Sequence, residues 1–179
     1  MALEAPEEAH LSCVQSVTIS PDGTLAASGS ENSAVKMWDI EKRTELCTFA
    51  HGSRPVYRVA FSPNSRMLGS ISLEGTVKLW DIAKESIIHM LGTPHYDRHV
   101  RFDPQYADSP YFHIAFSPDG KMLSSVSPSY GQFRRRPIKL WDTTRGVLLC
   151  DLQGHTSDIG PYGESDIIRS VALSNYLLG

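Results

Sequence analysis

The amino-acid sequence predicts an all-β fold built from repeated four-stranded antiparallel units, and two observations carry this prediction. First, the stretch SPDGTLAASGSENSAVKMWDI at residues 20–40 returns 42 residues later as SPNSRMLGSISLEGTVKLWDI. A third copy ends in KLWDT at residues 139–143, and its Trp follows the second Trp by 61 residues, about nineteen more than the first spacing. Second, short apolar stretches alternate with polar turns in every copy, and no amphipathic helix is evident. The chain therefore repeats one β unit.

The first unit shows how each strand is predicted. Apolar stretches at 14–20, 24–30, 34–40 and 44–50 are separated by Pro-Asp-Gly at 21–23, by a short polar turn, and by Glu-Lys-Arg at 41–43. Pro, Asp and Gly each favour the backbone angles of a tight turn. A period of about 40 residues, with four strands and a terminal Trp-Asp pair, is typical of a β-propeller blade.

Three Trp-Asp pairs, beginning at Trp38, Trp80 and Trp141, occur together with the Ser-Pro-Asp/Asn turns and a Gly-His pair at 154–155. With these motifs, residues 14–174 resemble the WD-repeat β-propeller family. The resemblance implies an acidic lead at 1–13, a WD-repeat domain at 14–179 and blades at about 14–50, 55–92 and 111–153. An inserted loop at 93–110 and the start of a fourth blade at about 166–179 complete this division.

Only three blades are complete, whereas propellers usually close with about 4–8. We therefore expect a partial propeller in the form of an open arc, belonging to a fragment of a longer protein. Self-association that completes the propeller across two chains is the alternative.

The resemblance also implies a buried polar network in each blade, shared by a His, a Ser, a Trp and an Asp. The matching positions in this sequence are His10, Ser28, Trp38, His51, Ser70, Trp80, Ser125, Trp141 and His155. The Asp is missing, because Asn32 and Glu74 stand in its place and the third unit has an insertion there. We therefore expect blades that are less stable than those of the family pattern.

In the family, the residue that opens the first strand of a blade lies near the central channel and often contacts partners. The matching positions are Gln15, Tyr57, Phe112 and Arg169. Aromatic side chains and Arg are common at the centre of protein interfaces, so we expect a partner-binding surface here. The alternative is that Tyr57 and Phe112 only pack between blades.

The function implied by the resemblance is a non-enzymatic scaffold or adaptor that binds other proteins or peptides. The repeats resemble those of larger NACHT-type signalling receptors. One alternative is a stand-alone adaptor of mitochondrial fission or ribosome assembly. Another is a ubiquitin-ligase substrate receptor, although Glu41, Ala83 and Thr144 stand where such receptors often carry Arg or Lys.

The sequence gives weaker support to a metal site, an enzyme site or an anion-binding site. His95, Asp97 and His99 would share one face of a strand, which leaves a metal or enzyme site there as an alternative. The basic cluster at Arg134–Arg136 suits an anion, but it lies between the second and third strands and not where phosphoinositide-binding propellers carry theirs. Neither a G-x-S-x-G motif nor a phosphate-binding loop occurs, so we expect no enzyme, no metal and no cofactor.

Composition and charge argue against several further classes of function. The net charge is −3, which argues against nucleic-acid binding, and no apolar run is long enough to span a membrane. Cys13, Cys47 and Cys150 lack metal-ligand spacing, and Cys47 and Cys150 stand at equivalent positions where we expect small buried side chains. With no secretory signal evident, the cytoplasm is the expected compartment and the nucleus an alternative.

Overall fold

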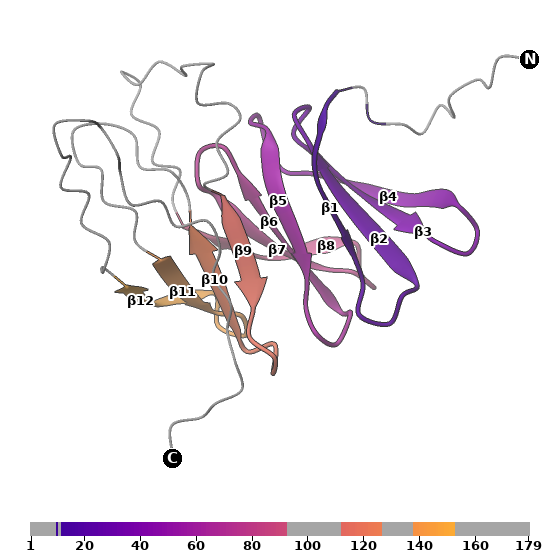
Figure 1. Ribbon diagram of the computed structural model, residues 1–179. Helices are drawn as coiled ribbons and strands as arrows, with labels where there is room; N and C mark the ends of the chain where they lie inside the picture. The colour runs from indigo at the N-terminus through magenta and orange to yellow at the C-terminus, as the bar shows by residue number, and fades with distance from the viewer. Residues whose placement is uncertain (1–9, 11, 93–111, 127–137, 153–179) are drawn as a thin grey trace, which may run out of the picture.

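The protein is described by a computed structural model that covers residues 10, 12–92, 112–126 and 138–152. These residues form three four-stranded antiparallel sheets, and each sheet keeps its strands in chain order (Figure 1). The predicted all-β fold of repeated four-stranded units is confirmed. The predicted loop at 93–110 and the start of a fourth blade lie outside the described residues.

Each sheet is a meander of four short strands. Sheet 1 contains β1 (Val14–Ile19), β2 (Leu25–Ser30), β3 (Ala34–Asp39) and β4 (Thr44–Ala50). Sheet 2 contains β5 (Val56–Phe61), β6 (Met67–Ser72), β7 (Val77–Asp81) and β8 (Ser86–Leu91). Sheet 3 contains β9 (His113–Phe116), β10 (Met122–Val126), β11 (Ile138–Asp142) and β12 (Val147–Leu152).

The same turn joins the first two strands of every sheet. In sheet 1 the Ser20 hydroxyl donates to Asp22 Oδ1 at 2.7 Å and accepts from the Leu25 amide at 2.9 Å. Gly23 has a φ of 75°, a left-handed conformation that glycine adopts without steric cost. Ser62 with Asn64, and Ser117 with Asp119, repeat this bonding in the other sheets. The Ser-Pro-Asp/Asn pattern thus forms the turn that the sequence predicts.

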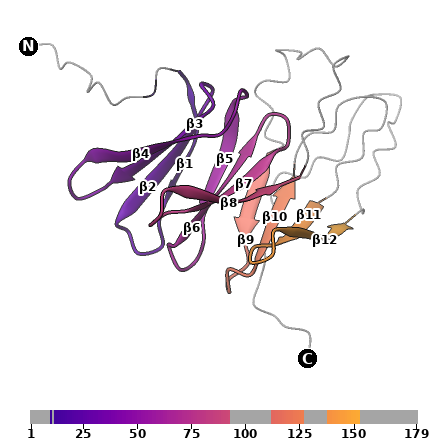
Figure 2. The same ribbon diagram turned by 180° about the vertical axis from the view of Figure 1, so that it is seen from behind.

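The sheets stack face to face in chain order, as Figures 1 and 2 show from opposite sides. We call the face that carries the Trp of the Trp-Asp pair the leading face, and the opposite one the trailing face. Val35, Met37 and Phe49 on the trailing face of sheet 1 pack with Val59 and Trp80 on the leading face of sheet 2. The Phe49 and Trp80 rings stack with centroids 4.7 Å apart.

Sheet 2 packs against sheet 3 in the same way. Ile71 and Leu91 of sheet 2 belong to one buried cluster with Ile114, Leu123 and Trp141 of sheet 3. Each sheet thus buries apolar side chains that it could not bury alone, which is the physical reason for stacking repeats.

Sheet 1 has no described sheet against its leading face. Val17 and Ile19 on β1 are 66% and 61% exposed there. The three described sheets form an open arc and not a closed ring (Figure 1).

Candidate functional site

The predicted polar network can be followed in all three sheets through one repeated hydrogen bond. The indole nitrogen of Trp38 donates to Ser28 Oγ at 2.9 Å, and those of Trp80 and Trp141 donate to their serines at 2.8 Å. The serine partners of the latter two are Ser70 and Ser125. Antiparallel pairing brings these residues together, because the serine and the tryptophan lie on neighbouring strands and their side chains share one face of the sheet.

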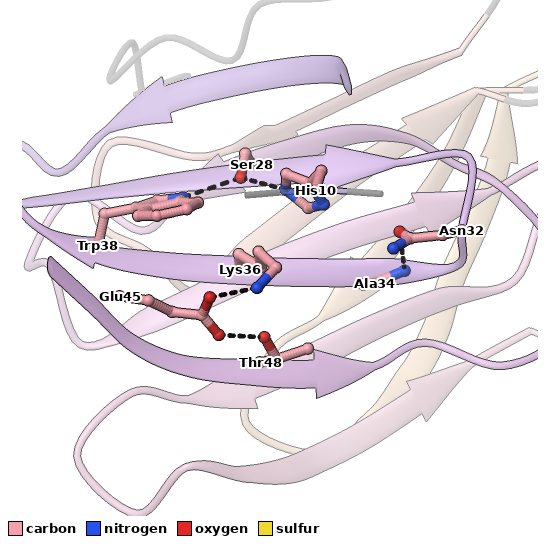
Figure 3. A network of polar contacts seen from close by, with 8 residues as sticks. All are labelled: His10, Ser28, Asn32, Ala34, Lys36, Trp38, Glu45 and Thr48. Carbon is pink, nitrogen blue, oxygen red and sulfur yellow. Dashed lines mark hydrogen bonds and ion pairs between the residues drawn. The ribbon is translucent and has the colours of Figure 1, made fainter. Parts of the chain in front are cut away.

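In sheet 1 the network extends to a histidine (Figure 3). His10 Nε2 lies 2.6 Å from Ser28 Oγ, so Ser28 joins the Trp38 and His10 rings. Burial, followed by the positive charge of Lys36, lowers the pKa of His10. Asn32, at the place of the family's Asp, accepts from the Ala34 amide at 3.3 Å, and its side chain partly opposes the lowering of the His10 pKa.

In sheet 2 the histidine is placed differently. His51 is 2% exposed, and its Nε2 lies 3.5 Å from the main-chain oxygen of Ser70 instead of its hydroxyl. Burial, followed by the charge of Lys78, lowers the pKa of His51 to about 4. Glu74, at the Asp position of this unit, accepts from the Thr76 hydroxyl at 3.4 Å. His155, predicted for the third network, lies outside the described residues.

A lysine accompanies each network tryptophan. The ammonium groups of Lys36, Lys78 and Lys139 lie 5.7, 5.5 and 5.9 Å from the ring centroids of Trp38, Trp80 and Trp141. This distance is within the range of a cation–π interaction. The sequence signal is a Lys two residues before every Trp, since residues i and i+2 of a strand share a face.

Among the described residues, only the sheet 1 lysine also forms an ion pair. Lys36 forms an ion pair with Glu45, and Glu45 accepts a hydrogen bond from the Thr48 hydroxyl (Figure 3). In sheet 2 the residues opposite Trp80 and Lys78 are Ile87 and Met90. The outer part of the leading face is therefore polar in sheet 1 and apolar in sheet 2.

Three of the predicted partner-binding positions lie at equivalent places at the start of the first strands, namely Gln15, Tyr57 and Phe112. Tyr57 and Phe112 are 5% and 2% exposed, and their rings stack with centroids 4.4 Å apart. Gln15 is half-buried, and its side-chain amide donates to Glu31 at 2.8 Å. Arg169 lies outside the described residues. Contact of these four side chains with a partner stays a prediction, whereas the stacking of Tyr57 on Phe112 is observed.

The structure corrects one expectation about the cysteines. Burial, followed by the charges of Glu85 and Glu45, raises the pKa of the half-buried Cys47 thiol to about 11. Cys150 is exposed, although its repeat position predicts a buried side chain. It lies on β12, whose residues are all exposed, so strand position alone does not determine its burial.

Other candidate sites fall outside the described residues, namely His95, Asp97 and His99 and the Arg134–Arg136 cluster. The described part of the chain contains no group of three His, Cys, Asp or Glu side chains that could hold a metal ion. It also contains no helix long and apolar enough to cross a membrane.

Comparison with known families gives the class of the protein. Residues 5–39 and 43–81 match the model of the WD domain, G-beta repeat. No curated protein matches the chain. The two matched repeats end at the Trp-Asp pairs of sheets 1 and 2, and sheet 3 has the same strand order and the same Trp–Ser hydrogen bond. Residues 5–39 and 43–81 are therefore two WD40 repeats, and sheet 3 has the same architecture.

Proposed function

We propose that this protein is a non-enzymatic scaffold that binds other proteins or peptides. The observation that carries the proposal is the stack of WD blades with large apolar side chains left exposed at its surface. On sheet 1 these include Val17 and Ile19, and on the outer strands of sheets 2 and 3 they include Met90, Leu149 and Leu152. Clustered exposed apolar surface often marks an interaction site.

WD40 domains generally bind proteins, which supports the class of function but names no partner. Within this class we favour a module of a larger signalling or assembly protein. A stand-alone adaptor and a ubiquitin-ligase substrate receptor are the competing proposals. Fold alone does not choose among them, because unrelated functions share the same propeller architecture.

Quantitative affinity capture with chemical cross-linking tests the scaffold proposal. We expect the folded wild-type chain to retain a protein partner stoichiometrically, with cross-links on residues of the three sheets. Capture should weaken when exposed apolar residues are replaced by Glu, as in Met90→Glu or Leu149→Glu. A folded chain that retains no partner under any condition would contradict the proposal.

Self-association is a second candidate, favoured by the leading face of sheet 1. Val17 and Ile19 correspond to Val59 and Phe61, which sheet 1 covers in the arc. Light scattering on the purified chain, compared with Val17→Glu/Ile19→Glu, tests it. We expect a dimer that the double variant converts to a monomer, and a monomeric wild type would contradict this candidate.

A further inference from the structure

We propose that β12 is a docking edge at which a partner protein adds an extended, mainly apolar strand that carries a basic residue. This inference rests on the proposed scaffold function and deepens it by naming the form of the partner. The site lies at the edge of sheet 3 opposite to β9, and therefore away from the predicted positions at the start of the first strands (Figure 1).

The strands β4, β8 and β12 are outer edge strands, because each stands at the end of the strand order of its sheet. An edge strand presents backbone N–H and C=O groups along its free side, and another strand can pair with them. Proteins protect such edges with charged residues, prolines or bulges. The register shifts at the same place in all three outer strands, at Leu46, Ile88 and Leu149, so bulges do not distinguish them.

The first two outer edges are protected in other ways. The edge strand β4 carries Glu45, which forms an ion pair with Lys36. The edge strand β8 has no Asp, Glu, Lys or Arg, but sheet 3 contacts it, since His89 Nε2 lies 3.0 Å from the main-chain oxygen of Thr144. Leu91 at the end of β8 is fully buried. Neither strand therefore offers a long free edge.

The third outer edge, β12, is the least protected. All six of its residues are exposed. Four of them are large and apolar, and Val147, Leu148, Leu149 and Leu152 are 47%, 42%, 49% and 47% exposed. The only charged side chain of the strand is Asp151, which forms no ion pair with a described residue. A short apolar edge strand with little charge and no proline favours the addition of another strand.

The side chains of β12 indicate which strand fits. Asp151 stands opposite Lys139 by register, but the ammonium group of Lys139 lies 5.9 Å from the ring centroid of Trp141. A basic residue on an added strand can form a cross-strand pair with the exposed Asp151. Cys150 and Leu152 precede and follow Asp151, so their side chains lie on the other face and offer apolar contact. The edge therefore fits a strand that alternates basic and apolar residues.

A second copy of β12 fits this edge less well. In an antiparallel pair of two β12 strands, the carboxylate of Asp151 would face an apolar residue of the other copy, because the strand contains no cation. A partner strand with Lys or Arg at that position gives the carboxylate an opposite charge. The charge of β12 therefore favours a different protein over self-pairing.

The test measures binding of the fluorescein-labelled peptide Val-Lys-Val-Lys-Val-Lys-Val to the purified chain by fluorescence anisotropy. We expect binding that depends on the peptide backbone. Of two forms N-methylated on the valines or on the lysines, one should bind at least about tenfold more weakly than the other, because only one set of N–H groups faces the edge. Glu in place of every Lys in the peptide should weaken binding by about threefold or more.

Variants of the chain place the peptide on β12. Leu149→Lys adds a charge that repels the lysines of the peptide, and it should weaken binding by at least about tenfold. The matched control is Leu46→Lys at the same repeat position of β4, since Leu46 is 45% exposed and Leu149 is 49% exposed. It should leave the affinity within about twofold. Asp151→Asn should weaken binding by about threefold, because the cross-strand pair is lost.

A wild-type chain that does not bind the peptide, equal binding of the two N-methylated forms, or equal weakening by Leu46→Lys would overturn the site. If Leu149→Lys does not fold, Asp151→Asn and Leu152→Lys decide, and wild-type affinity in both folded variants overturns the site. A wild-type dimer that Leu149→Lys converts to a monomer would overturn the choice of occupant in favour of a second copy.

The failure of this site and the failure of the scaffold function are distinguishable. Partner capture that survives Leu149→Lys removes the site and leaves the scaffold function standing. A folded chain that binds the peptide but captures no protein contradicts the scaffold function, although the edge itself accepts a strand.

Discussion

Sheets 1 and 2 share a sequence pattern but differ in what covers their leading faces. Val17 and Ile19 on β1 are 66% and 61% exposed, whereas their counterparts 42 residues later, Val59 and Phe61, are 6% and 8% exposed. Trp38 is half-buried, and Trp80 is 3% exposed beneath Phe49 of sheet 1. The difference teaches that burial in this fold comes from the neighbouring sheet and not from the sheet's own residues.

The largest expected effect is a difference between the two tryptophans. Trp80→Ala should lower the free energy of unfolding by about 3–5 kcal/mol, since it removes a packed aromatic ring from the boundary of two sheets. Trp38→Ala should cost about 1–2 kcal/mol, because less surface is buried. Both variants lose the same Trp–Ser hydrogen bond, so urea unfolding isolates the packing effect. Equal losses would mean that the leading face of sheet 1 is covered in solution.

The histidines should give the next largest effect, as a function of pH. The folded pKa of His51 is about 4 and its unfolded pKa about 6.5, so the unfolded chain binds protons more readily. The contribution of the neutral His51 to stability is therefore fully present above pH 6.5 and is lost as the pH falls towards 4. We expect a loss of about 2 kcal/mol between about pH 7.5 and pH 5 from this group.

Urea unfolding of the wild type and of His51→Gln at both pH values measures how much His51 contributes to the pH dependence of the free energy of unfolding. The variant should show a shallower pH dependence, and an unchanged slope would contradict the assignment to His51. His10→Gln is the matched variant in sheet 1. It should flatten the slope less, because His10 is only half-buried and its pKa is lowered less.

A smaller effect should come from the close approach of sheets 1 and 2. A Cβ atom added at Gly29 would lie 2.8 Å from Val56 Cγ1, closer than packed atoms tolerate. Gly29→Ala should therefore cost about 1–2 kcal/mol of stability. Part of this loss should be recovered in the double variant with Val56→Ala. Strictly additive losses of stability in the double-mutant cycle would show that there is no steric conflict between the two positions.

The smallest expected effect comes from restoring the Asp that the polar network of sheet 1 lacks. Nδ1 of His10 is buried and has no described partner at normal hydrogen-bond geometry, although the Asn32 side chain is close enough to raise the pKa of the ring in part. Asn32→Asp should provide an acceptor there and raise the stability by about 0.5–1.5 kcal/mol. It should also raise the pKa of His10, which NMR titration of the ring would show. An unchanged pKa and an unchanged melting temperature would mean that residue 32 does not reach the ring.

Much of the local structure could be predicted from particular residues. The Ser-Pro-Asp/Asn turns and the four strands of each unit follow from the repeat and from the alternation of strands, and the Trp–Ser pairing was implied by the resemblance to WD repeats. The contacts between the first strands were harder to predict, because they join different repeats. Arg58 meets the Gln15 carbonyl across 43 residues, and no feature of its own repeat signals that contact. The stack of Tyr57 on Phe112 likewise depends on two separate sheets.

The sequence by itself determined the class of fold, the two WD40 repeats at 5–39 and 43–81 and the strand order within each sheet, because these depend on patterns that recur within about 40 residues. Only the tertiary structure decided which of the repeated residues are buried. Val17 and Val59 belong to the same pattern, yet one is exposed and the other is in the core. The physical reason is that a sheet has two faces, and each face becomes part of a core only when another sheet covers it.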